Sequence, residues 1–91
     1  MDAPLSPIAE TARLENATET LAEYVGYLTN EILSEEHKPI PNIGRIKALT
    51  HECDLVFKER RAITPDNIDL INRAIYVYAP HLKLMHINSG R

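Results

Sequence analysis

Histidine, cysteine and carboxylate side chains are the residues of this chain that could carry catalysis or hold a metal ion. The densest group is His51-Glu52-Cys53-Asp54. Consecutive helix residues point in different directions, and His51 and Cys53 lie about 160° apart, so they cannot bind one ion together. His81 and His86 are five residues apart, whereas two metal-binding histidines on one helix are usually four apart. We therefore expect no metal site.

Signatures of enzyme and cofactor families are also missing from the sequence. Gly26, Gly44 and Gly90 are too scattered to form a phosphate-binding loop. Neither a nucleophile elbow nor a pair of catalytic carboxylates stands out. Cys53 falls on the apolar stripe of its predicted helix, where a free cysteine behaves as a small hydrophobic residue. The sequence thus predicts a protein that is not an enzyme, with no cofactor and a structural cysteine.

Three segments show the apolar periodicity of amphipathic helices, and they cover residues 7–33, 43–61 and 65–78. Each follows a residue type that commonly caps a helix, respectively Ser6, Asn42 and Thr64. Pro7 and Pro65 stand at the first helical position, where proline is well tolerated. Gly26 in the first helix is either a tolerated defect or a point where a second helix approaches closely.

Prolines divide the chain between these helices. Residues 35–42 contain two prolines and form a linker, and Pro80 ends the third helix because it lacks an N–H. Residues 81–87 then form either a short fourth helix or a strand-like tail, and residues 1–6 and 88–91 are expected to fray. The 91 residues make one domain. The predicted fold is all-α, a compact bundle of three main helices with a possible short C-terminal fourth helix.

Acidic residues concentrate at the start of the chain. Residues 1–36 carry eight acids against one basic residue, a net charge of −7, whereas residues 37–61 carry six Lys or Arg against three acids. On the first helix, three glutamates spaced four apart form one acidic line, consisting of Glu15, Glu19 and Glu23. The other flank of the apolar stripe carries Tyr24, Tyr27 and Glu31. We predict that these six residues form a surface that binds another protein with a basic surface.

One face of the second helix gathers four basic side chains, which are Lys47, His51, Lys58 and Arg61. This basic face either pairs with the acidic line or contacts DNA. Because a short turn joins the second and third helices, the alternative function is a small DNA-binding transcriptional regulator. Asp66 and Asp69 at the start of the third helix would face phosphates, and the net charge of −3 also argues against a nucleic-acid partner.

The third helix carries a second apolar line, formed by Leu70 and Val77 with Arg73 between their turns. Either the tail covers it or a second chain does, and isologous dimers are the commonest oligomers. We expect a homodimer that associates through these three residues.

The expected localisation is cytoplasmic. The chain starts without a signal-peptide pattern, has one cysteine, and has no apolar run near the ~18 residues that span a bilayer, so no membrane partner is expected. The predicted function is non-catalytic: the protein binds another protein through its acidic first helix and inhibits or modulates it.

Overall fold

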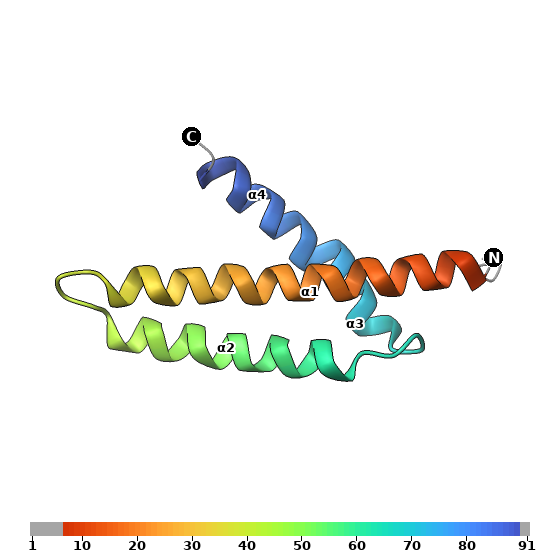
Figure 1. The fold of residues 1–91 in the computed structure, drawn as a ribbon, viewed down its shortest axis with the longest axis horizontal. Helices are drawn as coiled ribbons and strands as arrows, with labels where there is room; N and C mark the ends of the chain where they lie inside the picture. Colours follow the sequence, from red (N-terminus) through yellow and green to blue (C-terminus); the bar gives the residue numbers. More distant parts are fainter. Residues whose placement is uncertain (1–6, 90–91) are drawn as a thin grey trace.

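The computed structural model describes residues 7–89 (Figure 1). Its elements are α1 (Pro7–Glu36), α2 (Ile43–Ala62), α3 (Ile68–Arg73), the π-helical turn η1 (Ala74–Tyr78) and α4 (Ala79–Ser89). No strand occurs among these residues, which confirms the all-α fold class. The fraying expected at residues 1–6, 90 and 91 lies outside the described residues, whereas residues 88–89 belong to α4.

The helices α1 and α2 form an antiparallel hairpin whose loop is fixed by one buried carboxylate (Figure 1). Glu35 accepts hydrogen bonds from the backbone N–H of Asn42 and from Lys38 Nζ, both at 2.9 Å, and Arg45 Nε lies 3.3 Å away. The bond from Asn42, followed by that from Lys38, lowers the pKa of Glu35. Asn42 caps α2 as expected, since its Oδ1 accepts from the N–H of Arg45 at 3.0 Å.

The third helix begins three residues later than the sequence predicts, because the expected cap belongs to a turn. The Thr64 hydroxyl donates to Asp66 Oδ1 at 2.5 Å, and the N–H of Asn67 donates to the Thr64 carbonyl at 3.0 Å. Asn67 is the actual cap, and its Oδ1 accepts from the N–H of Leu70 at 3.2 Å. Thr64 and Pro65 therefore precede the helix rather than start it.

Pro80 does not end the helix, and this prediction was wrong. The elements α3, η1 and α4 follow one another without a break, so the expected fourth helix is a bent continuation of the third. Just before the proline, the N–H of Ala79 donates to the carbonyl of Ala74, five residues back. Proline removes a donor and crowds the carbonyl four residues before it. The wider π turn gives the backbone room at this point, and the helix bends instead of stopping.

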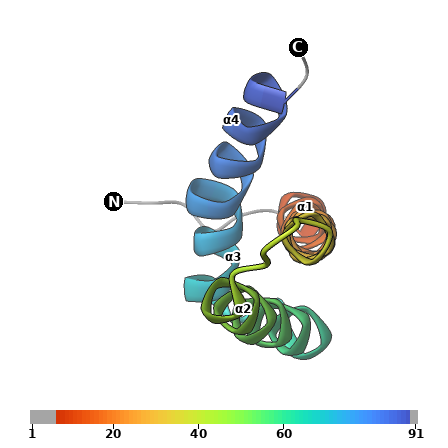
Figure 2. The same cartoon turned by 90° about the vertical axis from the view of Figure 1, so that its left-hand side faces the viewer.

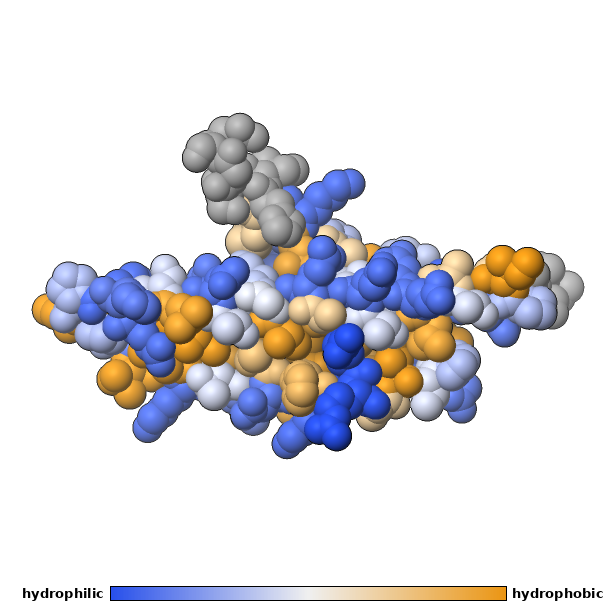
Figure 3. Space-filling model, viewed as in Figure 1, coloured by the Kyte–Doolittle hydropathy of each residue, from blue (hydrophilic) through white to orange (hydrophobic). Residues whose placement is uncertain are grey.

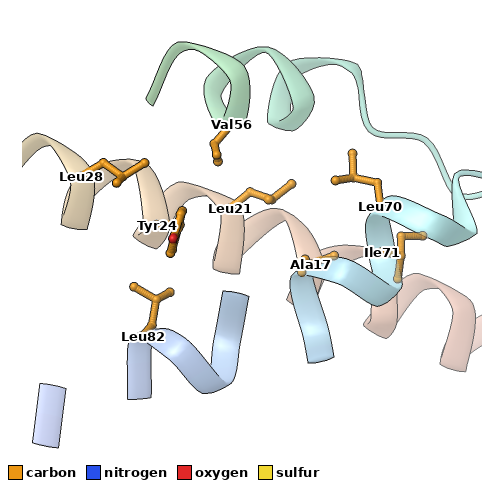
Figure 4. Packing of buried hydrophobic residues seen from close by; sticks show 9 residues of the cluster. Ala17, Leu21, Tyr24, Leu28, Val56, Leu70, Ile71 and Leu82 are labelled. Carbon is orange, nitrogen blue, oxygen red and sulfur yellow. The ribbon is translucent and has the colours of Figure 1, made fainter. Parts of the chain in front are cut away.

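The core lies where the third helix crosses the hairpin (Figure 2). In Figure 4, Val56 of α2 and Leu82 of α4 point from opposite sides toward Leu21 and Tyr24 of α1. The other buried apolar residues are Ala17, Leu28, Leu70, Ile71 and Ala74. No described helix is both long and apolar enough to cross a membrane.

The molecule is elongated rather than compact. Its Cα radius of gyration is 15.5 Å, whereas a compact domain of this length has about 12 Å. Its extents are 54 × 30 × 19 Å, because α1 is long and α4 projects away from the hairpin (Figures 1 and 2). Much of the surface of each helix is therefore left without a neighbour in the same chain.

Candidate interaction surfaces

The acidic line lies on the solvent side of α1. Glu15, Glu19 and Glu23 are all exposed, and at 100° per residue they lie opposite the buried Leu21 and Leu28. No ion pair within the described part of the chain involves them. Hydrophilic residues follow α1 in the space-filling view (Figure 3). The structure thus brings the three glutamates together as a free carboxylate surface.

The basic face of α2 does not neutralise this line. All four of its residues are exposed, and Lys58 lies about 160° around the helix from Val56, which points at α1. Arg61 stacks its guanidinium over Phe57, at 5.8 Å from the ring centroid. Asp54 falls on the same face and reduces its charge. The basic residue that reaches the acidic line is Arg60, which shares a shallow groove with Glu19, Glu23, Thr18 and Ala22.

Other charged residues hold the helices together. Arg45 Nη2 lies 2.9 Å from Glu31 Oε1 and thereby joins α2 to α1. Arg73 Nη1 lies 2.6 Å from Glu59 Oε2 and joins α3 to α2. Glu31 and Arg73 were expected on interaction surfaces, but both already bind a residue of the same chain.

Tyr24 lies in the core and is 7% exposed, so it does not edge the acidic line as expected. Its ring stacks on Tyr78 at a centroid distance of 4.6 Å and lies 5.9 Å from His81. Its hydroxyl donates to Glu52 Oε2 at 3.2 Å. Burial, and next the nearby Glu52 carboxylate, raise the pKa of Tyr24 to about 12.

Tyr27 lies beside this aromatic cluster and stays half-buried. Its ring is 5.7 Å from Tyr24 and 5.8 Å from His81. Burial, followed by the charge of Glu31, raises the pKa of Tyr27. The sequence did not reveal the cluster, although Tyr24 and Tyr78 lie beside or on apolar stripes. The stacked rings hold α1 against η1 and α4.

The second apolar line of the third helix does not exist as a surface. Leu70 is buried in the core, whereas Val77 is 55% exposed. The π turn between them changes the angle per residue and moves Val77 away from the direction of Leu70. The expected dimer surface of Leu70, Arg73 and Val77 is therefore not assembled.

An apolar strip that the sequence did not reveal lies along the hairpin, on the side away from α3 and η1. Cys53 marks it, because its Sγ lies 3.8 Å from Thr29 Oγ1 and 4.0 Å from the carbonyl of Val25. None of its residues is fully buried. We call it the apolar seam, and its members are Ala22, Val25, Thr29 and Leu33 of α1, and Ile43, Ile46, Cys53 and Phe57 of α2. Figure 3 looks onto this side, where orange residues run between the two helices.

Within the described residues, no group of three or more His, Cys, Asp or Glu side chains could hold a metal ion. The Tyr24 hydroxyl stays protonated at neutral pH and serves as a hydrogen-bond donor. No protein-family model, curated protein or solved structure matches the chain.

Proposed function

We propose that this is a small non-catalytic protein that binds another protein through the acidic line of α1, inhibits or modulates it, and also associates with itself. The observation that carries the proposal is the exposure of Glu15, Glu19 and Glu23 without an ion pair among the described residues. The ion pairs that join α1 to α2 use Glu31 and Glu35 instead.

Charge repulsion along the acidic line supports this function. Like charges four residues apart on a helix cost about 0.2–0.5 kcal/mol per pair. The basic face of α2 does not offset this cost, and Arg60 lies near only part of the line. A partner with a basic surface would relieve the repulsion, and complementary charge would also speed association and favour the correct partner.

The test replaces all three glutamates with glutamine. Because the repulsion disappears, we expect the free energy of unfolding to rise slightly, while proteins captured from the native host and identified by mass spectrometry are lost. A control with the same charge change away from the line, Glu10→Gln with Glu36→Gln and Asp54→Asn, should keep them. A salt-sensitive fall in melting temperature with capture intact would show that the line is already neutralised, within the chain or between two copies, and would refute binding of another protein there.

The alternative function, binding to DNA, is favoured by one observation. The four residues of the basic face are exposed on one side of α2, and none forms an ion pair among the described residues. Binding to duplex DNA that weakens steeply with salt, and that is lost in Lys47→Gln with Lys58→Gln, would support it. Absence of such binding at low salt would exclude it.

A further inference from the structure

We propose that the apolar seam is covered by the same seam of a second copy, with each α1 lying on α2 of the other copy. The inference deepens the self-association part of the proposed function and rests on it. It replaces the dimer surface expected on the third helix, which the fold does not assemble.

Exposed apolar side chains define the contact. Leu33, Ile43 and Phe57 are 47%, 59% and 45% exposed, and they lie on one side of the hairpin together with the half-buried Val25 and Cys53. A pair of packed helices has a groove on each of its two sides, and α3 with η1 fills only the other one (Figure 2). Contiguous apolar surface of this kind marks an association site.

The two edges of the seam carry opposite charges. On the α1 edge lie Glu15 and Glu19 of the acidic line, both exposed. On the α2 edge, Arg61 lies over the seam residue Phe57. Arg60 lies closer to α1, where it shares a groove with Glu19 and the seam residue Ala22. A surface with one acidic and one basic edge is complementary to its own copy in one orientation.

Symmetry decides which orientation that is. A two-fold axis parallel to the helices places α1 on α2 of the other copy, so that each acidic edge meets a basic edge. An axis across the helices places α1 on α1 in the opposite direction, so that each acidic edge meets the other α1 and no basic edge. Of these two arrangements, the first pairs opposite charges, and the charges therefore favour it.

The parallel axis also fixes the register. Rotation about this axis does not change the position of a residue along the hairpin. Residues that lie level with each other on α1 and α2 of one chain are therefore also level across the two chains. Within the chain Glu31 is level with Arg45, and Val25 is level with Cys53. Continuing this antiparallel pairing toward the start of α1 brings Glu15 and Glu19 level with the last turns of α2. Those turns carry the basic residues Lys58, Arg60 and Arg61. Acidic and basic groups therefore meet without any shift along the helices.

The first experiment places a charge on the seam and measures the oligomeric state by sedimentation velocity. Wild type should be a dimer, and Phe57→Glu and Ile43→Glu should each raise the dissociation constant on the order of 10-fold or more. Both side chains are exposed, so the variants should keep their helical circular dichroism. The matched controls are Val77→Glu and Tyr76→Glu, which alter exposed apolar residues of η1, and they should remain dimeric. A monomeric wild type at high micromolar concentration, or dimers lost only in the controls, would overturn the inference.

The second experiment tests the orientation by exchanging charges. Glu15→Lys with Glu19→Lys should weaken the homodimer, and so should Arg60→Glu with Arg61→Glu. When the two variants are mixed, a heterodimer should form, because each lysine edge then meets a glutamate edge. Failure of the mixture to associate would refute the proposed orientation.

The outcome is separable from the proposed function. Phe57→Glu leaves the acidic line intact. If this variant is monomeric and still captures the partners of the wild type, the binding of another protein does not depend on the dimer. If wild type is monomeric, the seam proposal fails together with the self-association part of the proposed function, and the glutamine variants still decide whether the acidic line binds another protein.

Discussion

At the residue scale, Tyr24 joins three elements of the core through two different interactions. Its ring stacks on Tyr78 of η1, and its hydroxyl donates to Glu52 of α2. The hydroxyl therefore needs its proton in the folded state, which agrees with its raised pKa of about 12. A tyrosine whose pKa is raised by folding stabilises the protein below its unfolded pKa, and this contribution is lost as the pH rises toward the folded value.

We predict that Tyr24→Phe lowers the free energy of unfolding by about 1 kcal/mol at neutral pH, the usual value of one hydrogen bond. It should also reduce the loss of stability between about pH 10 and pH 12, because this proton is no longer released on unfolding. Chemical denaturation across that pH range measures both effects. The exposed Tyr76→Phe is the control and should change neither. An unaltered alkaline profile in Tyr24→Phe would contradict the prediction.

The contribution of Glu35 to stability depends on pH in the opposite direction. Its pKa is lowered by the hydrogen bond from Asn42 and by Lys38, so its contribution is present above its unfolded pKa and is lost as the pH falls through the folded pKa. We predict that Glu35→Gln loosens the hairpin loop, lowers stability at neutral pH and weakens the acid dependence of unfolding. The measurement is the melting temperature from acidic to neutral pH, and the exposed neighbour Glu36→Gln should behave as wild type.

Single-residue placement was the least predictable level of this molecule. Tyr24 and Leu70 were expected on surfaces and are buried, whereas Glu31 and Arg73 were expected on surfaces and form ion pairs within the chain. A helical pattern shows which residues share a face. It does not show on which flank of α1 the third helix packs, which decides the outcome for Tyr24, Leu70 and Arg73. It also does not show which residue of α2 lies beside Glu31.

At the element scale, α1 and α2 follow from local rules, and the third helix does not. Apolar spacing and the caps near Pro7 and Asn42 predicted the first two helices within a few residues. The prediction that the helix ends at Pro80 was wrong, because the π turn before the proline gives the backbone room for its ring. That turn is supported by Ala74, which is buried, and by the stack of Tyr78 on Tyr24, so it depends on contacts distant in the sequence.

Gly26 gives an element-scale prediction, because a Cβ built there meets nothing within 4 Å. The close approach considered from the sequence therefore does not occur among the described residues. We predict that Gly26→Ala raises the free energy of unfolding by up to about 1 kcal/mol, the helix propensity difference. Chemical denaturation measures it.

Gly44→Ala, in the first turn of α2, is the control for this substitution. Its Cβ would lie 3.5 Å from Asn42 Oδ1, an ordinary contact, and we expect a smaller gain than at Gly26. A loss of stability in Gly26→Ala would reveal a close contact of α1 that one chain does not contain. Such a loss would point to a second helix over this position.

At the scale of the whole molecule, the folded state depends on a small core. Among the residues that the structure describes, nine apolar side chains are buried, and a domain has only about 5–15 kcal/mol of stability to lose. Leu28 is among the most completely buried of these residues. We predict that Leu28→Ala costs about 2–5 kcal/mol, since it removes buried methyl groups and leaves a cavity. Leu55→Ala, at an exposed position of α2 away from the seam, should cost far less. Equal unfolding midpoints in urea would contradict this assignment of the core.

The number and order of the helices were predictable at this scale, but the shape was not. Composition, length and periodicity led to an all-α domain of three main helices. The elongation and the apolar seam arise because α3 and η1 occupy one groove of the hairpin while α4 leaves it. Nothing in the spacing of Leu33, Ile43 or Phe57 distinguishes a groove that is filled from one that is open.

The one-sided packing of the hairpin divides its sequence into two groups that respond to different selective pressures. Changes on the side that faces Tyr78 and Leu82 alter whether the chain folds. Changes at Thr29, Ile43 or Phe57, which are exposed members of the apolar seam, are expected to leave the fold nearly unaltered. Affinity for whatever covers that side can therefore drift, strengthen or be lost over generations at almost constant stability. The hairpin thus offers one groove that is conserved by folding and one that is free to specialise.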